Sequence, residues 1–250
     1  MSEWTIKETY QLPSQGKLYP GKVDPNITLR SMDTTDEMTR LNKNGGYKAM
    51  CDMIDGCMVD CNPGISTYDM CIGDYIFLLH KIRTVTYGAD YKMECKCPFC
   101  RITSTEVVNL DEIPINYYSD EVNKHLELDL PACKKHVRLN YQTPRMVDSI
   151  DSKTEEIRKR SASKVDRGLI ITLQHLIREI DGRIPDAIEL EEFCQHLPMK
   201  DCNYILKHVE KLNNSIGPEL MIEVDCEVCG STYRTLFRQT SEFFGPSIDD

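Results

Sequence analysis

Several patterns typical of enzymes, membrane proteins and exported proteins are missing from this chain of 250 residues. No apolar run approaches the length needed to cross a bilayer, and the opening residues Met1 to Thr5 lack the basic and then apolar pattern of a secretion signal. The chain also lacks a glycine-rich phosphate loop, a His-Glu-x-x-His helix and a Gly-x-Ser-x-Gly turn. We therefore expect a protein of the cytoplasm that is not an enzyme and has no membrane partner.

Positive charge is also scarce. The chain has 30 Lys and Arg residues against 40 Asp and Glu residues, and its net charge is -10. Proteins that bind nucleic acid depend on neutralising phosphates, so this balance argues against nucleic acid as the main partner. The basic run Arg158 to Lys164 keeps a zinc-ribbon nucleic-acid-binding or transcription-related protein open as the alternative.

Cysteine, in contrast, is plentiful, with 12 residues. Without an export signal, these cysteines are expected to be thiols or metal ligands and not disulfides. Two hooks stand out, Cys97-Pro98-Phe99-Cys100 and Cys226-Glu227-Val228-Cys229. A Cys-x-x-Cys turn places two sulfurs on one side of a tight knuckle, and two knuckles supply a closed tetrahedral set. We predict a structural Zn²⁺ site with four ligands, which are Cys97, Cys100, Cys226 and Cys229.

The two hooks are separated by 125 residues, whereas an ordinary zinc finger closes its loop within a few dozen. A shared ion would therefore connect the middle of the chain to its C-terminal part. Closing so long a loop removes much of the conformational freedom of the unfolded chain, and structural zinc contributes on the order of 10 kcal/mol in finger-like peptides. The intervening segment is expected to be an insertion carried by the metal-bound hairpins.

Other cysteines offer rival interpretations. The hook Cys133-Lys134-Lys135-His136 could complete a site with Cys97 and Cys100, but the C-terminal pair would then lack a partner. Cys95 is a weaker competitor because its spacing from Cys97 would disturb the knuckle. A further group matches no knuckle spacing and is expected to pack as small buried hydrophobes. That group is Cys51, Cys57, Cys61 and Cys71.

Hydrophobic periodicity and turn residues predict both strands and helices. Strands are expected at Trp4 to Tyr10, Ile27 to Met32, Tyr91 to Cys97, Ile102 to Leu110, Leu220 to Asp225 and Ser231 to Arg238. Alternating residues from Leu126 to Tyr141 predict a two-stranded ribbon. Helices are expected from a capping box at Thr34 to Glu37, at Tyr47 to Met58, from Ser66 or Thr67 to Tyr87, at Leu169 to Ile180, at Asp186 to His196 and at Met199 to Leu212.

Together these elements predict an α+β fold with a zinc-ribbon-like β platform formed by mid-chain and C-terminal hairpins. Residues 1–90 are expected to form an N-terminal strand and helix region. The platform is expected to comprise residues 91–142 and 216–250, and residues 143–215 a mostly helical insertion.

Short landmarks at both ends of the chain carry a family resemblance. They are Leu12-Pro13-Ser14-Gln15-Gly16-Lys17-Leu18-Tyr19, Ile27 to Met32, the helix start Thr34 to Met38, Tyr87-Gly88, the two hooks, and Glu242-Phe243-Phe244-Gly245-Pro246. In these segments the chain resembles the T-even-type phage baseplate proteins that act in assembly of the central hub. The helical stretch from residue 143 to 215 carries little of this resemblance.

The resemblance implies a structural or assembly protein of a tailed bacteriophage, either a hub component or a hub-assembly chaperone. Its expected partners are other phage tail or baseplate hub proteins, with several copies in a symmetric assembly as one arrangement. The expected location is the cytoplasm of the bacterial host during assembly, and the tail baseplate of the virion if the chain stays there.

Overall fold

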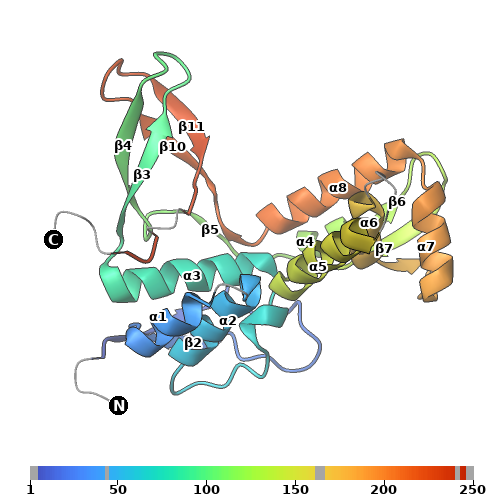
Figure 1. Cartoon of the computed structure of the whole chain (residues 1–250), viewed down its shortest axis with the longest axis horizontal. Coiled ribbons are helices and arrows are strands. Elements are labelled where there is room, and N and C mark those ends of the chain that lie inside the picture. The colour runs from blue at the N-terminus through green and yellow to red at the C-terminus, as the bar shows by residue number, and fades with distance from the viewer. Residues whose placement is uncertain (1–4, 43–44, 161–166, 240–242, 246–250) are drawn as a thin grey trace.

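The structure, a computed structural model, describes residues 5–42, 45–160, 167–239 and 243–245 (Figure 1). Its helices are α1 (Thr34–Arg40), α2 (Gly46–Cys57), the 3-10 helix η1 (Thr67–Asp69), α3 (Ile72–Tyr87), α4 (Glu121–Leu126), α5 (Pro144–Arg160), α6 (Gly168–Leu176), α7 (Ala187–His196) and α8 (Met199–Asn214). Its strands are β1 (Lys7–Gln11), β2 (Asn26–Arg30), β3 (Asp90–Lys96), β4 (Thr103–Asn109), β5 (Ile115–Asn116), β6 (Glu127–Asp129), β7 (His136–Leu139), β8 (Ile177–Ile180), β9 (Gly217–Pro218), β10 (Met221–Asp225) and β11 (Thr232–Leu236).

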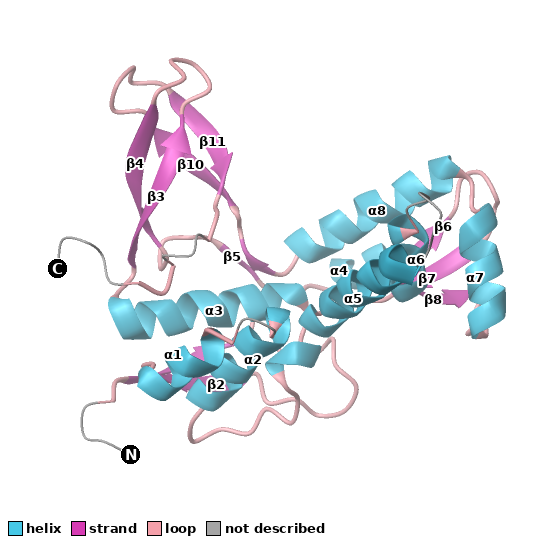
Figure 2. Ribbon diagram, in the orientation of Figure 1, coloured by secondary structure: helices cyan, strands magenta, loops and turns pink. Residues whose placement is uncertain are grey.

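The strands form small antiparallel sheets. Four are two-stranded, β1–β2, β3–β4, β5–β9 and β10–β11, and one is three-stranded, β6–β7–β8. Figure 2 shows the separate strand pairs among the helices. The mixture of helices and small sheets confirms the predicted α+β class. Among the described residues, no helix combines the length and the apolar character needed to cross a membrane.

The elements group into three regions, a body, an arm and a lobe. The body comprises β1, β2 and helices α1 to α3; the arm comprises the hairpins β3–β4 and β10–β11; the lobe comprises β6 to β8 and α5 to α8. In Figure 1 the arm projects from one end of α3, and the lobe lies well away from the arm's tips. Two hydrophobic clusters underlie this division, one in the body and arm and the other in the lobe.

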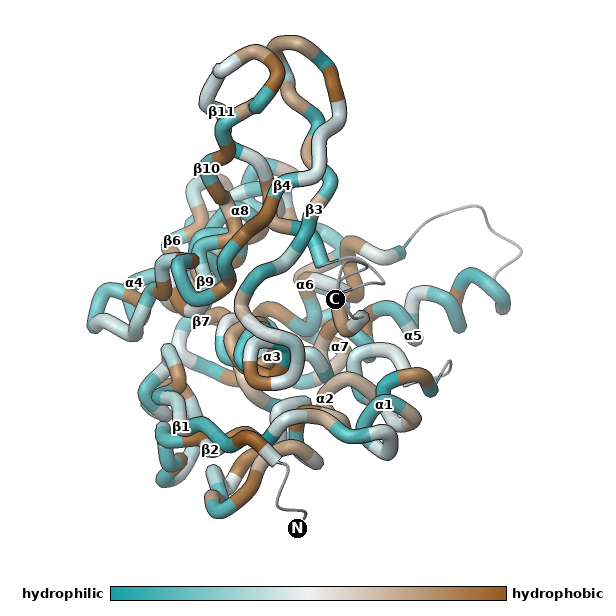
Figure 3. The backbone as a smooth tube through the Cα atoms, turned by 90° about the vertical axis from the view of Figure 1, so that its left-hand side faces the viewer, coloured by the Kyte–Doolittle hydropathy of each residue, from teal (hydrophilic) through white to brown (hydrophobic). Residues whose placement is uncertain are grey.

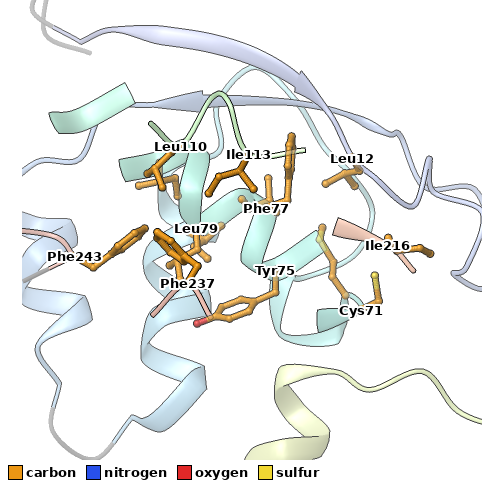
Figure 4. Close-up of a cluster of buried hydrophobic side chains, with 14 of the residues drawn as sticks. Leu12, Cys71, Tyr75, Phe77, Leu79, Leu110, Ile113, Ile216, Phe237 and Phe243 are labelled. Atoms are coloured by element: carbon orange, nitrogen blue, oxygen red, sulfur yellow. The ribbon is translucent and has the colours of Figure 1, made fainter. Parts of the chain in front are cut away.

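Helix α3 is the central element of the first cluster. Figure 3 looks along it, with the arm above and β1, β2, α1 and α2 below. Most of its surface is buried, including the polar residues Asp74, His80 and Arg83. A helix that is covered on nearly all sides must be apolar on more than one stripe. Figure 4 shows Tyr75, Phe77 and other α3 side chains in the core, with contributions from both ends of the chain.

The start of α3 lies against the short strand β9, and glycine makes this contact possible. A Cβ atom on Gly73 would lie 2.1 Å from the carbonyl oxygen of Ile216. A Cβ atom on Gly217, which has a φ of +101°, would lie 2.7 Å from the Cα and the carbonyl oxygen of Gly73. Because a real Cβ essentially never approaches another heavy atom within 3.0 Å, both positions require glycine. The return of the chain from α8 into the arm therefore passes directly over α3.

The arm is attached to α3 by an aromatic cluster. Tyr91 at the start of β3 lies 5.5 Å from Phe237 and 5.1 Å from Phe243, measured between ring centroids. His80 on α3 lies 5.1 Å from Phe237, and the guanidinium of Arg83 lies 5.5 Å from the ring of Tyr91. Burial lowers the pKa of His80 to about 3, so this imidazole is neutral and acts as a packing residue. Phe243 is thus part of the core.

The lobe has a core of its own. Its three-stranded sheet supplies Leu128, Leu130, Val137 and Leu139, all of which are buried. The helices supply Leu173, Leu176, Cys194, Cys202, Ile205 and Val209, while Ile177 comes from β8 and Leu197 from the connection between α7 and α8. The predicted ribbon between residues 126 and 141 therefore shares a core with the helices of the predicted insertion. The division into domains stays a prediction, and this packing favours a boundary near residue 127 over one at 143.

The predicted helix from Leu169 to Ile180 is too long. Helix α6 ends at Leu176, and Ile177–Ile180 form β8, which pairs with β7. The apolar spacing fits a helix throughout, but the open edge of β7 offers this segment a strand partner, and tertiary pairing outweighs local pattern. The ribbon consequently becomes a three-stranded sheet. Leu126, predicted in the ribbon, is the last residue of α4, a helix that periodicity did not predict.

Two helix starts also differ from the prediction. The capping box of α1 involves Asp33 and Asp36, one residue before the predicted Thr34 to Glu37, because the Asp33 carboxylate accepts the N–H groups of Thr35 and Asp36. The helix predicted from Ser66 or Thr67 is interrupted between η1 and α3, where Met70 and Cys71 are extended. Trp4, Glu242 and Pro246 lie outside the described residues.

Candidate metal centre

Each cysteine hook lies at the tip of one hairpin of the arm, and the two hooks fold in the same way. In the first, the N–H of Cys97 donates to the carbonyl of Ile102, and the N–H of Arg101 donates to the carbonyl of Cys97. In the second, the N–H of Cys226 donates to the carbonyl of Ser231, and that of Gly230 donates to the carbonyl of Cys226. The four donor–acceptor distances lie between 2.8 and 3.0 Å. The knuckles are therefore two copies of one backbone arrangement.

Each knuckle closes through one residue in the left-handed region, directly after its second cysteine. In the second hook this residue is Gly230, with a φ of +68°; in the first it is Arg101, with a φ of +63°. Glycine adopts this conformation without cost, whereas other residues rarely do. Sequence inspection identified the glycine but not Arg101, and the matching position after Cys229 is the signal that would have identified it.

The four thiols converge between the tips. The sulfur atoms of Cys97, Cys100, Cys226 and Cys229 all lie within 4.8 Å of one another. The Sγ of Cys97 is 3.7 Å from that of Cys229, and the Sγ of Cys100 is 3.7 Å from that of Cys226. Both short pairs join one hook to the other, so the cluster connects two segments that are remote in sequence. All of the cysteines are free thiols.

These distances fit a tetrahedral zinc ion. A Zn–S bond of about 2.3 Å in a regular tetrahedron places neighbouring sulfurs about 3.8 Å apart. The cross-hook distances of 3.7 Å agree with that value. Four thiolates are also the donor set of closed structural zinc sites. The donor set and its spacing therefore fit the ion predicted from sequence, and they leave no coordination position for a substrate.

The cluster is buried on one side and open on the other. Cys97 and Cys226, the first cysteine of each hook, are buried, Cys100 is half-buried, and Cys229 is exposed. Hydrogen bonds from the side chain and backbone of Ser231 lower the pKa of the Cys229 thiol to about 6. A thiolate is the form that binds metal, and Ser231 stabilises that form at the exposed ligand. Sequence inspection did not identify Ser231.

The rival hook lies elsewhere. Cys133 and His136 belong to the lobe, on the loop before β7 and on its first residue, far from the arm's tips in Figure 1. The ring of His136 hydrogen bonds to Asp129 over 2.9 Å, and the carboxylate of Asp201 accepts the N–H groups of Ala132 and Cys133. The four-thiol cluster contains neither residue.

The remaining cysteines weighed as ligands lie in the core. Cys95 is buried on β3 on the same side as Tyr91 and Met93. Cys51, Cys57 and Cys71 are buried in the body, and Cys61 packs against that cluster. Burial raises the thiol pKa of Cys57 to about 12, so it stays neutral. These residues behave as the small hydrophobes that their spacing predicted.

A sequence profile described as T4 bacteriophage base plate protein matches residues 5–245. The match covers the body, the arm with both hooks, and the lobe. Neither the curated proteins nor the solved structures contain a match to this chain.

Proposed function

The chain belongs to the family of T4 bacteriophage base plate proteins, and from this membership we propose that it acts in the central hub of a phage tail baseplate, as a hub component or as a chaperone of hub assembly. The observation that carries the proposal is the extent of the match, residues 5–245. Membership suggests a structural protein that is not an enzyme, associates with the virion tail and interacts with other baseplate or tail proteins.

The four-thiol cluster supports a structural role for a metal. Zinc, held by Cys97, Cys100, Cys226 and Cys229, would supply a closed cross-link between the hairpins. Isolated two-stranded hairpins are marginally stable in water, so such a link would make the arm rigid. A rigid projection suits a protein that positions neighbours in an assembly.

The tips of the arm carry exposed apolar side chains beside the cluster. Phe99 is 66% exposed, Val228 57% and Ile102 45%. Apolar groups gathered at the end of a projection are a common feature of contact surfaces. They support docking of the tip on a neighbouring baseplate protein, in the host cytoplasm during assembly and in the finished tail if the chain is a hub component.

The test is genetic and compositional. In a phage whose gene for this chain is disrupted, we expect tails to fail at hub formation, and complementation by the intact gene to restore them. Mass spectrometry then separates the two roles: a hub component is found in purified virions and in baseplate intermediates, whereas a chaperone is found only in intermediates. Absence from both, with normal hubs in the disrupted phage, would refute the proposal.

The nucleic-acid alternative has less support. Part of its basic run, residues 161–164, lies outside the described residues, and Arg158 forms an ion pair with Glu155 at 3.0 Å. The arm, where a zinc ribbon would contact nucleic acid, carries more acidic than basic residues. Retention of the purified protein on DNA or RNA at low salt would support this alternative.

A further inference from the structure

A groove of about 710 Å³ runs along the arm between β4 and β10. Its lining includes every residue from Glu106 to Asn109 on one side and every residue from Met221 to Asp225 on the other. Side chains of successive strand residues point to opposite faces. An unbroken run of lining residues therefore means that the strand edges, and not one face of each hairpin, border the groove.

The edge of β10 that faces away from β11 directs backbone groups outward. The N–H of Cys226 donates to Ser231 and the N–H of Phe237 donates to Leu220, so Leu220, Ile222, Val224 and Cys226 bond to β11. In an antiparallel pair the direction of these bonds alternates along the strand. The backbone groups of Met221, Glu223 and Asp225 consequently point outward. In the described part of the chain, β10 pairs only with β11.

The opposite wall is built in the same way. The N–H of Cys97 donates to Ile102 and that of Leu110 donates to Ala89, which directs Ser104, Glu106 and Val108 toward β3. Thr105, Val107 and Asn109 therefore point their backbone groups outward. As far as the structure describes the chain, β3 is the one strand that pairs with β4.

The groove is strongly acidic. Six carboxylates line it, from Glu106, Glu112, Glu219, Glu223, Asp225 and Glu227. The lining contains a single basic residue, Arg234. Its guanidinium donates to the outward carbonyl of Met221 over 3.2 Å and lies 3.8 Å from Glu219. A cationic donor is thus already bound at one acceptor of the open edge.

Apolar side chains lie between the charges. Val107 is 60% exposed and Met221 is 41% exposed, and Val108, Ile113 and Ile222 also line the groove. Charged side chains on an edge strand can serve to prevent pairing with other strands. That role does not require exposed apolar side chains beside the carboxylates. On β10, Glu223 and Asp225 lie on one face of the strand and Ile222 and Val224 on the other, which complements a strand that alternates basic and apolar residues.

We propose that this groove binds an extended basic segment of a partner protein, which adds to β10 as a strand through the backbone groups of Met221, Glu223 and Asp225. Its basic side chains lie on the face of Glu223 and Asp225, inside the carboxylate-lined groove, and its apolar side chains pack on Ile222 on the opposite face. The inference assigns a partner chemistry to the assembly role and in that respect rests on the proposed function.

The test uses the full-length, zinc-loaded chain and a capped seven-residue peptide that alternates lysine and valine. We expect the peptide to bind at low ionic strength. Its affinity should fall several-fold as the salt concentration rises to about 0.15 M, where the screening length is about 8 Å. Neutralising one carboxylate on each wall, Glu106→Gln with Glu223→Gln, is expected to lower the affinity roughly fivefold. The control pair Asp90→Asn with Glu94→Gln, exposed on β3 outside the groove lining, should leave it unchanged.

Two further measurements separate strand addition from charge attraction alone. Amide hydrogen exchange at Met221, Glu223 and Asp225 should slow on binding, while exchange in β7 stays the same. A peptide of equal charge with proline in place of valine should bind at least tenfold more weakly, since it lacks the required N–H groups. Equal binding of both peptides, equal loss in the control pair, or no binding at low salt would overturn the proposal.

Sedimentation of the chain alone tests whether a second copy occupies the groove. Self-association that the Glu106→Gln, Glu223→Gln variant abolishes would assign the groove to another copy and overturn the partner assignment. None of these measurements requires phage growth. If the peptide does not bind but the gene is required for hub formation, only the groove proposal is refuted. If the peptide binds but hubs form normally without the gene, only the proposed hub role is refuted.

Discussion

The arm consists of two separate two-stranded hairpins, whereas the lobe packs a three-stranded sheet against helices α5 to α8. The interior of the arm contains few large apolar side chains, chiefly Tyr91, Met93, Val224 and Tyr233, and its far end contains four thiols. The lobe is filled mainly by leucine, isoleucine and valine from its three strands and from α6 and α8, together with Cys194 of α7 and Cys202 of α8.

The difference shows two ways of stabilising a small region. Isolated two-stranded hairpins bury little apolar surface, so the proposed metal would stabilise the arm at the end farthest from the body. The lobe buries enough surface to need no such link. The two regions should therefore respond differently to loss of the thiols and to loss of packing.

Removing the metal or a ligand should affect the arm alone. We expect Cys97→Ser or Cys229→Ser to reduce bound zinc to near nothing, and the lost contribution is on the order of 10 kcal/mol. Hydrogen exchange should accelerate in β4 and β10 but not in α8. Metal analysis and limited proteolysis provide the measurements.

The matched control for this prediction is Cys133→Ser in the lobe, which should keep a full equivalent of zinc. A ligand variant that retains a full equivalent and the protease resistance of the unaltered protein would show that the ligand set is wrong. Loss of zinc in Cys133→Ser would instead implicate the rival hook.

A cavity in the lobe should destabilise the lobe and leave the arm unchanged. Ile205 on α8 is fully buried, and Ile205→Ala should cost about 4 kcal/mol through lost packing and the cavity left behind. Exchange should accelerate in β6 to β8, while zinc content stays the same. Ile188→Ala, at a position 79% exposed, is the control and should change the free energy of unfolding by less than about 0.5 kcal/mol. Zinc release from Ile205→Ala would show that the two regions are not independent.

A buried carboxylate should make the lobe sensitive to acid. Burial of Asp201 raises its pKa, but the N–H groups of Ala132 and Cys133 outweigh this effect, and the net pKa lies below its usual value. Because the folded pKa is lowered, this stabilisation is present above about pH 4, the unfolded pKa, and is lost as pH falls through the folded value.

Replacement of this carboxylate, Asp201→Asn, should therefore cost about 2 kcal/mol at neutral pH and flatten the acid limb of the stability profile. Urea unfolding followed by circular dichroism between pH 2 and about pH 7 measures both effects across the range where the carboxylate titrates. An unchanged acid limb would assign the acid sensitivity to other groups.

The smallest effects should distinguish the two knuckles of the arm. Gly230→Ala places a side chain at a φ of +68° with no atom within 4 Å of the new Cβ, so only backbone strain should appear, about 1 kcal/mol. Arg101→Gly should have the opposite sign and stabilise the arm by about 0.5 kcal/mol, because glycine removes strain but adds unfolded-state entropy. Competition with a chelator measures zinc affinity in both variants. Equal effects of the same sign would contradict the equivalence of the knuckles.

Sequence inspection succeeded where chemistry is local. The Cys-x-x-Cys spacing identifies two knuckles by itself, and the alternating residues of β3 identify its buried face. Sequence inspection was less reliable where contact with another segment decided the secondary structure. The segment Ile177–Ile180 has helical spacing, yet it forms β8 because the edge of β7 is open to it.

The acidic groove could not be predicted for a related reason. Glu106 and Glu223 are far apart in the chain, and nothing in the sequence around either one sets it apart from other charged strand residues. Their proximity depends on how two hairpins are placed by the aromatic contacts of Tyr91 and Phe237 with α3. Sequence periodicity contains no information on that placement.

The amino-acid sequence by itself determined the kinds of elements, the α+β class and the four thiols able to bind a metal, because these follow from spacing over a few residues. Tertiary structure decided that the thiols meet, that the ribbon joins the lobe, and that two strand edges border an acidic groove. Those outcomes depend on contacts between segments from about forty to more than a hundred residues apart, where packing and not local pattern sets the geometry.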